Sequence, residues 1–189
     1  PDLRIPLKLI EVSDLVKDEE FKVFSEPAKK LNSRVVALKL PNGNSLSRGQ
    51  IDDYTKFVSK FGAKGLAYIK INDIDDFENG IQSPILKFLN NETVKNILEN
   101  LQAETGDLIF FGAGSSTIVN LSMSSLIKKL GEDLNLYVTK WAPCWIINFP
   151  MFELNNEGNL TPLHHPFTLP KCSKKEILEK PEDAIAHAY

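Results

Sequence analysis

The sequence predicts a two-layer α+β fold, in which helices pack on a sheet. Short runs of apolar and β-branched residues are separated by segments whose apolar residues recur at helical spacing. The helical segments do not alternate strictly with the strands, which favours α+β over a doubly wound parallel sheet. Hydrophobic residues make up 42% of the 189 residues and charged residues 25%, so the chain has enough apolar surface to fold.

Four strands are predicted in the first part of the chain, at residues 21–24, 34–40, 66–71 and 108–111. The second ends at a Pro-Asn-Gly-Asn sequence, residues 41–44, which is typical of a turn. The fourth, Leu-Ile-Phe-Phe, has the composition of a buried strand. A polar connection, residues 72–80, follows the third strand.

The helix with the clearest boundaries is predicted to follow Ser47. Ser47 and Gln50 have the spacing of a capping box, in which each side chain can satisfy a backbone N–H of the first turn. Apolar residues then recur at helical spacing between residues 51 and 61. Gly62 stands where a left-handed C-cap falls, so the helix is expected to end there.

Two further helices are predicted from the same periodicity. One covers residues 94–101, with Asn90 or Asn91 as its N-cap. The other runs from about residue 116 to residue 130, and Gly131 is expected to end it.

The pattern changes after Trp141. An apolar run over residues 144–154 and a second extended run over residues 160–167 are separated by turn residues, which predicts an antiparallel hairpin. The last stretch, residues 173–189, has one amphipathic helical pattern that Pro181 interrupts. These changes place one lobe at about residues 20–138, between flanks that belong to another, incomplete domain.

Charge and cysteine content exclude several classes of protein. The net charge of −3 argues against a lobe that wraps nucleic acid, which needs clustered Lys and Arg. Cys144 and Cys172 lack CxxC spacing, so a reducing cytoplasm is expected, with Cys144 as a small core residue. No apolar run approaches the ~18 residues of a membrane span. The start at Pro1, without an initiating Met, suggests the interior of a longer chain.

Two adjacent histidines, His164 and His165, are the most prominent candidate site. Successive strand side chains point to opposite faces, so the two rings are not expected to ligate one metal. Without further context, one core-facing and one solvent-facing histidine is the favoured interpretation. Glu153 on the partner strand would bring a carboxylate to the same end of the hairpin, which makes a polar functional site the competing interpretation.

Other candidate motifs have simpler interpretations. Residues 112–116, Gly-Ala-Gly-Ser-Ser, resemble a phosphate-binding turn, but Thr117 replaces the third glycine of that motif and no P-loop lysine follows. A tight strand-to-helix turn is therefore favoured. The neighbouring carboxylates at residues 19–20, 52–53 and 75–76 are expected on the solvated surface.

Several motifs resemble bacterial-type aspartyl-tRNA synthetases, in the same order and from residue 1 to about Lys171. The segment around His164 and His165, with residues 149–153 before it, resembles the stretch that precedes the third signature motif of that family. The upstream segments that carry the resemblance are residues 1–4, 21–24, 46–48, 62–67 and 106–113. The central part is similar to the GAD domain inserted in these enzymes, which also occurs in subunits of tRNA-dependent amidotransferases.

The resemblance implies a DCoH-like two-layer GAD insertion at residues 20–138. Residues 1–19 would be a lead-in from a class II catalytic domain built on an antiparallel sheet, and residues 139–189 a further segment of that domain. The two ends of the inserted lobe are then expected to lie side by side. The resemblance also implies a homodimeric, cytoplasmic parent that acts on neither membrane nor DNA.

The implied reaction is that of an aspartate–tRNA ligase. Such a parent activates L-aspartate with ATP and Mg²⁺ to aspartyl-adenylate and transfers the aspartyl group to tRNA(Asp). By motif, His164 would contact L-aspartate and His165 would be its neighbour near the adenylate, with no protein-bound metal. The ATP-binding motifs of class II enzymes are absent from these residues, so the chain alone is expected to bind no ATP or Mg²⁺ tightly and to be inactive.

The chain departs from the family pattern at two positions. Asn148 and Gly114 stand where the family usually or often has Asp. The first is interpreted as a packing variation, and the second weakens any role argued from an acidic residue there. One alternative is a non-catalytic tRNA-associated module of an amidotransferase subunit. A small metallohydrolase that uses His164, His165 and Glu153 is a second alternative, but strand geometry argues against it unless metal analysis shows stoichiometric zinc.

Overall fold

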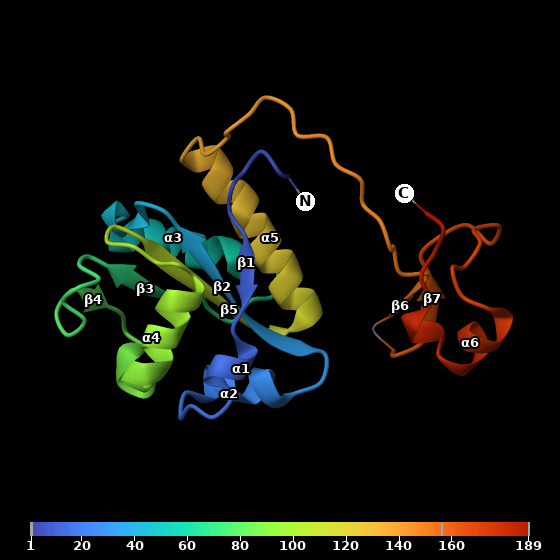
Figure 1. The fold of residues 1–189 in the computed structure, drawn as a ribbon, viewed down its shortest axis with the longest axis horizontal. Coiled ribbons are helices and arrows are strands. Elements are labelled where there is room, and N and C mark those ends of the chain that lie inside the picture. The colour runs from blue at the N-terminus through green and yellow to red at the C-terminus, as the bar shows by residue number, and fades with distance from the viewer. Residues whose placement is uncertain (1, 156, 189) are drawn as a thin grey trace. The chain divides into compact units, whose positions relative to one another are not determined.

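A computed structural model describes residues 2–155 and 157–188 of the chain, which form two compact units (Figure 1). The first unit is Pro1–Trp141 and the second is Ala142–Tyr189. Within the described residues, no helix combines the length and the apolar character that crossing a membrane requires.

A five-stranded antiparallel sheet forms the centre of the first unit. Its strand order is β1-β2-β5-β3-β4, and each neighbouring pair is antiparallel. The strands are β1 (Leu9–Glu11), β2 (Ser33–Leu40), β5 (Leu108–Ser115), β3 (Ala67–Ile71) and β4 (Ile81–Gln82). The α+β class and the strands expected at residues 34–40, 66–71 and 108–111 are therefore confirmed, although β5 is four residues longer than expected.

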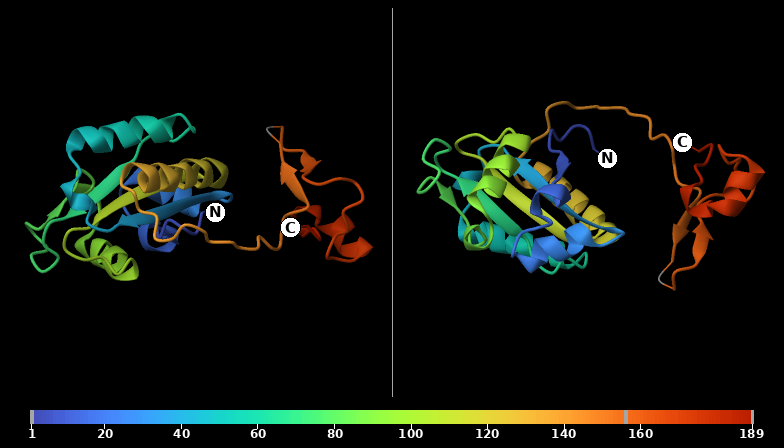
Figure 2. Two further views of the ribbon diagram at one scale, coloured as in Figure 1. Left: turned by 90° about the horizontal axis from the view of Figure 1, so that it is seen from above. Right: turned by 60° about the horizontal axis from the view of Figure 1, so that its bottom comes forward.

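One face of the sheet is covered by α3 (Arg48–Ser59) and α5 (Ser116–Asp133) (Figure 2, left). Alternation along β5 directs Leu108 and Phe110 to this face. Gly112 continues the same row, and a Cβ there would lie 2.6 Å from Met123 Cγ on α5. The absence of a side chain at Gly112 therefore lets α5 approach the sheet closely.

The opposite face is covered by α1 (Ser13–Val16), α2 (Lys22–Lys29) and α4 (Asn91–Asn100). Ile109 and Phe111 of β5 point into this second core, with Ile97 of α4. Because both faces are packed, the unit has three layers, and the expectation of two is wrong. The central strands are apolar on both faces, which is the pattern of a sheet covered on both sides.

The strand expected at residues 21–24 is also wrong, because α2 begins at Lys22. A four-residue run such as Phe-Lys-Val-Phe is too short to distinguish a strand from the start of a helix. Packing decides the outcome: the Phe21 ring contacts the Phe24 ring edge-on at 4.8 Å and stacks on Phe88 at 5.4 Å. Phe24 is 1% exposed in the second core.

The predicted helix boundaries are confirmed at the start of α3 but not at the end of α5. Ser47 and Gln50 form the expected capping box. Gly62 has a φ of +90°, but it lies beyond Lys60, the residue that caps α3. Gly131 lies inside α5 and does not end it, and a Cβ there would meet Ile5 Cδ1 at 2.4 Å. Gly131 therefore lets the N-terminal segment pack on the helix.

Glu19 is buried, which contradicts the expectation that residues 19–20 are solvated. It is 8% exposed, and its carboxylate accepts hydrogen bonds from the Asn90 backbone N–H at 2.9 Å and from the Thr93 hydroxyl. Asn90 precedes α4 but its side chain makes no cap hydrogen bond to the helix. Glu19 thus supplies an acceptor, and a negative charge, at the N-terminus of α4.

The N-terminal residues belong to the same compact unit as the sheet. Ile5 is buried in the first core, and β1 pairs with β2. The Val138 backbone N–H donates to the Arg4 carbonyl at 2.9 Å, and the Arg4 guanidinium lies 4.9 Å from the centre of the Tyr137 ring. The segments that enter and leave this unit are therefore side by side.

The second unit has a short hairpin and one helix. Strands β6 (Phe152–Leu154) and β7 (Leu160–Pro162) pair antiparallel, and α6 (Lys174–Glu179) begins with a capping box between Ser173 and Glu176. The predicted hairpin is present, but both strands are shorter than the expected runs over 144–154 and 160–167. Three short 3-10 helices complete the described elements of the chain, at Gly43–Ser45, Leu86–Phe88 and Pro181–Asp183.

Candidate functional site

The hairpin of the second unit is held by the last residues of the chain. Beyond β7, the Leu163 backbone N–H donates to the Met151 carbonyl, which extends the hairpin register. The Met151 N–H donates to Ala184, and the Ala186 N–H to the Phe149 carbonyl, both at 2.8 Å. These bonds position residues 149–151 and the histidines that follow β7.

His164 is half-buried at the end of this hairpin. Its Nε2 lies 3.1 Å from the Pro150 carbonyl oxygen, and its ring meets the Phe149 ring edge-on at 5.4 Å. A carbonyl oxygen only accepts, so this hydrogen bond requires a proton on Nε2. In the neutral ring, Nδ1 then remains an acceptor, able to bind an N–H of a ligand.

His165 is exposed and has different neighbours. Its Nδ1 accepts a hydrogen bond from the Phe167 backbone N–H at 3.3 Å, and the two rings lie 4.8 Å apart. This arrangement places the proton of the neutral ring on Nε2. The two histidines therefore offer different groups, an acceptor at His164 and a donor at His165, and they are not brought together as a pair of ligands.

Glu153 does not join the histidines. It lies opposite Thr161 in the hairpin, whereas the register places Pro150 opposite His164, three residues away on the other face. Over the described part of the chain, no group of three or more His, Cys, Asp or Glu residues could hold a metal ion. The metallohydrolase interpretation therefore has no ligand set among these residues.

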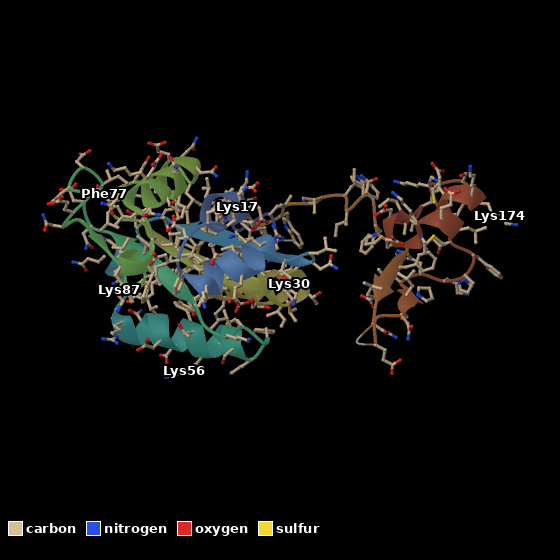
Figure 3. All side chains as sticks on the ribbon, turned by 90° about the horizontal axis from the view of Figure 1, so that it is seen from below. Lys17, Lys30, Lys56, Phe77, Lys87 and Lys174 are labelled. Carbon is tan, nitrogen blue, oxygen red and sulfur yellow. The ribbon has the colours of Figure 1, made fainter. Side chains whose placement is uncertain are left out.

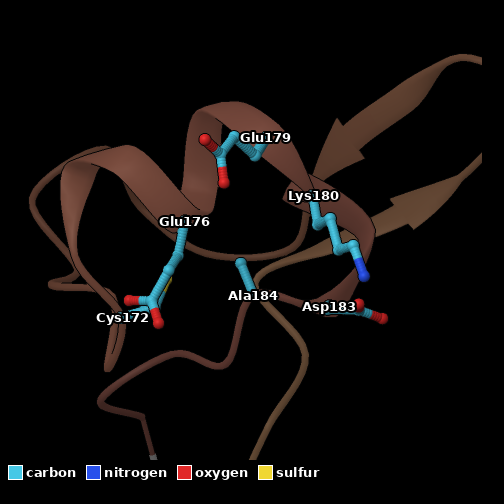
Figure 4. Close-up of a pocket in the computed structure, with 6 residues that line it drawn as sticks. All are labelled: Cys172, Glu176, Glu179, Lys180, Asp183 and Ala184. Atoms are coloured by element: carbon cyan, nitrogen blue, oxygen red, sulfur yellow. The ribbon is translucent and has the colours of Figure 1, made fainter.

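A small hollow of about 250 Å³ lies between α6 and the segment after it (Figure 4). Cys172 and Glu176 are on its wall, but the Glu176 carboxylate accepts from Ser173 in the capping box, and this lowers its pKa. Cys172 is half-buried. Cys144 is exposed, so the expectation that it is a core residue is wrong.

The first unit has a larger groove, of about 780 Å³. It lies beside the C-terminal half of β5, and residues of α2 and the first turn of α5 complete its walls. Three segments that carry the sequence resemblance meet there, residues 21–24, 62–67 and the end of 106–113. Sequence reasoning found these segments separately but did not predict the groove. Gly62, Gly65 and Gly114 all line the groove, and these residues without side chains are the feature of the sequence that could have indicated it.

The Gly-Ala-Gly-Ser-Ser segment lies along this groove. Gly112–Ser115 is the end of β5, and Ser115 is the N-cap residue of α5 without a side-chain cap hydrogen bond. Gly114 has a φ of +145°, a backbone conformation that favours glycine. The segment is thus a strand that turns directly into a helix, as the favoured interpretation predicts, and an Asp at position 114 would be strained.

Basic side chains are distributed over the first unit and do not form one cluster. Lys30, Lys56 and Lys87 extend from three different elements (Figure 3). Lys56 pairs with Asp53 at 3.1 Å, and the Lys87 ammonium lies 4.8 Å from the centre of the Phe88 ring. These three lysines therefore do not contribute to one common basic patch.

Comparison with known protein families matches the GAD domain at residues 24–123. The matched segment is 100 of the 189 residues and lies wholly within the first unit. It runs from Phe24 in α2 to Met123 in α5, and so includes the central strands and most of the groove walls. The chain therefore belongs to the GAD-domain family.

Proposed function

We propose that this chain is part of an aspartate–tRNA ligase, with the GAD lobe inserted in a class II catalytic domain of which residues 142–188 are a segment. The observation that carries the proposal is that one chain joins a GAD-family lobe to a hairpin presenting His164 and His165. In such a parent, a cytoplasmic homodimer, L-aspartate, ATP with Mg²⁺ and tRNA(Asp) are the ligands.

The path of the chain supports an insertion. A lobe looped out of another domain must begin and end at neighbouring points, and the Val138–Arg4 hydrogen bond brings the two ends of the first unit together. The residue that lies beside Val138 is Arg4, and residues before 20 belong to the same compact unit as the sheet. We therefore include the lead-in, residues 2–19, in the inserted lobe.

The surface of the second unit supports its assignment to a larger domain. Phe167 is 92% exposed and Leu178 is 73% exposed, whereas Ala184 and Ala186 are the buried hydrophobic residues in its described part. With so little apolar burial of its own, this unit would gain stability by covering its exposed apolar side chains against a larger domain. The remaining part of a catalytic domain is the partner that we propose for it.

The geometry of His164 supports a role in binding the amino-acid substrate. With Nε2–H held by the Pro150 carbonyl, Nδ1 of the neutral ring can accept a hydrogen bond from the α-ammonium of L-aspartate. His165 presents Nε2–H as a donor, which suits an oxygen of the adenylate. The groups that bind ATP and Mg²⁺ would come from other parts of the parent, because the ATP-binding motifs of class II enzymes are absent from this sequence.

The alternative is a non-catalytic tRNA-associated module of an amidotransferase subunit. The GAD match fits both proposals equally well. The histidine hairpin favours the ligase, because a freestanding module has no use for a segment that presents a substrate-binding histidine.

The direct test uses the complete reading frame that contains these residues. Aspartate-dependent ATP–pyrophosphate exchange is expected for the complete protein, and its absence would favour the module. His164→Ala is expected to lower kcat/KM for aspartate about 10- to 100-fold, the cost of one hydrogen bond to a charged group. His187→Ala, at an exposed histidine of the same unit, is the matched control.

Two results would contradict parts of the proposal. If His164→Ala and His187→Ala have equal kcat/KM, His164 does not bind aspartate. If titration calorimetry of the 189-residue chain shows micromolar ATP binding, the ATP site lies within this chain and the division of the site that we propose is wrong.

A further inference from the structure

One edge of β5 is open beside the groove. β3 begins at Ala67, which lies opposite Phe111, so β3 accompanies β5 only as far as that pair. β5 continues to Ser115 with β2 as its partner on the other side. In the described part of the chain, residues Gly112–Ser115 therefore have no strand on the groove side.

The main-chain groups of Ala113 point toward this open edge. The Val12 N–H donates to the Val35 carbonyl, so the polar groups of Val35 point away from β5, toward the segment that follows β1. Val35 lies opposite Ala113. Val35 and Ala113 are therefore a non-hydrogen-bonded pair, in which the backbone N–H and C=O of each residue point away from the other strand. The Ala113 N–H and C=O thus face away from β2. They are available to another strand.

The walls of the groove are apolar on both sides of this edge. On one face of the sheet, Val23 of α2 lines the groove and is 58% exposed, and the rings of Phe24 and Phe111 are packed beneath the surface with centres 5.3 Å apart. On the other face, Ile118 of α5 lies beside Gly62, where a Cβ would be 3.5 Å from its side chain. A strand added to β5 would direct alternate side chains to these two walls.

The charges at the rim favour an acidic partner. Lys22 and Lys64 line the groove and are exposed, and neither has an ion pair within the described residues. Glu26 is the one carboxylate among the lining residues. An extended segment with acidic residues on either side of an apolar centre would complement this distribution.

We propose that this groove binds an extended peptide segment by strand addition to β5, with about four apolar residues against Gly112–Ser115 and acidic residues near Lys22 and Lys64. Main-chain hydrogen bonds supply affinity in this mode, and the pockets for alternate side chains supply specificity. Single-stranded RNA is a poorer fit, because Phe24 and Phe111 are each 1% exposed and one face of the Phe21 ring is already stacked on Phe88. The proposal is independent of which parent protein carries the lobe.

The test is an NMR titration of the ¹⁵N-labelled 189-residue chain with three synthetic peptides. The first is acetyl-Glu-Asp-Val-Ile-Val-Val-Asp-Glu-amide. The second replaces its central Ile by Pro, and the third replaces its four acidic residues by Lys. The first peptide is expected to shift the Ala113 amide resonance and to slow its hydrogen exchange. The other two are expected to bind at least about tenfold more weakly, because each lacks one proposed interaction.

Variants of the chain locate the binding site. Ile118→Glu places a charge on the groove wall and is expected to weaken the first peptide about tenfold. Its matched control is Leu121→Glu, on an exposed residue one turn further along α5 and outside the groove. Replacing Lys22 and Lys64 by Glu is expected to weaken binding of the first peptide. The control variant, Lys95→Glu with Lys128→Glu, makes the same change in net charge at exposed lysines outside the groove and is expected to have little effect.

Three results would overturn the proposal. The first is no shift of groove amides by the first peptide at about 1 mM, a concentration that detects even weak binding. The second is equal binding by the first peptide and its Pro derivative, or by Ile118→Glu and Leu121→Glu. The third is tighter binding of a uridine octamer to the same amides, which would assign the groove to RNA.

Discussion

The two units of this chain use the same local signals but differ in what they bury. The first has packed cores on both faces of its sheet, with Phe110 and Phe111 at or below 1% exposure. The second has a hairpin and a capped helix, yet α6 contains no buried residue. Good turns and caps can therefore produce secondary structure in both, while only the first unit has the apolar burial that stabilises an independent domain.

The difference in burial between the two units is tested most directly by truncating one phenylalanine in each. Phe110→Ala is expected to lower the free energy of unfolding by about 4 kcal/mol, through lost burial and the cavity left in the first core. Phe167→Ala removes a side chain that is 92% exposed and is expected to change it by less than about 0.5 kcal/mol. Urea unfolding, followed by far-UV circular dichroism, measures the free energy of unfolding of both variants. Equal losses would show that the Phe167 ring is packed in the folded chain, which would contradict its exposure in the structure.

A second test concerns the buried carboxylate at the start of α4. Glu19→Ala leaves the Asn90 N–H and the Thr93 hydroxyl without their acceptor and is expected to cost about 2 kcal/mol. Glu20→Ala, at the exposed neighbour, is the control and is expected to be within about 0.5 kcal/mol of the unaltered chain. Thermal and urea unfolding give both values, and a loss no larger for Glu19→Ala would contradict its capping role.

A third test uses the pH dependence of stability that Tyr54 gives to the first unit. Removal from water, with the Asp133 carboxylate at 3.1 Å, raises the pKa of Tyr54 from 10.0 to about 12. The folded state then holds this proton more tightly than the unfolded state. Its contribution to stability is therefore complete below pH 10 and declines as pH rises toward 12.

Tyr54→Phe removes this source of pH dependence. Between pH 9 and pH 12, the unaltered chain is expected to lose up to about 2 kcal/mol more than the variant. Urea unfolding at several pH values measures the free energy of unfolding of both proteins. The lysines titrate in both, so their contribution cancels in the difference. Parallel pH profiles would show that the Tyr54 hydroxyl is not held as the structure indicates.

Much of the first unit could be predicted from sequence because its central elements are long and periodic. The strand at residues 34–40 and the helix after Ser47 were predicted because alternation and capping chemistry are local. The helix at Lys22–Lys29 was not, since Phe21 and Phe24 are placed by contacts with Phe88 and Phe111. Burial of Glu19 likewise depends on α4, about 70 residues away in the chain.

The sites could be predicted only in part for the same reason. The adjacent histidines are visible in the sequence, but their different partners depend on the hairpin register and on a turn at Phe167. The groove could not be predicted, because its walls come from segments that meet only in the folded unit. Its open edge depends on where β3 begins relative to β5.

The smallest expected effect compares one motif in both units. Ser47 with Gln50 and Ser173 with Glu176 form equivalent capping boxes. Ser47→Ala is expected to lower the global free energy of unfolding by about 1 kcal/mol, because α3 packs Ile51 and Val58 into the first core. Ser173→Ala is expected to leave the global value unchanged and to accelerate amide hydrogen exchange within α6 alone. If Ser173→Ala instead lowers the global value as much as Ser47→Ala, α6 must be coupled to a core, and the difference between the two units would be smaller than their burial indicates.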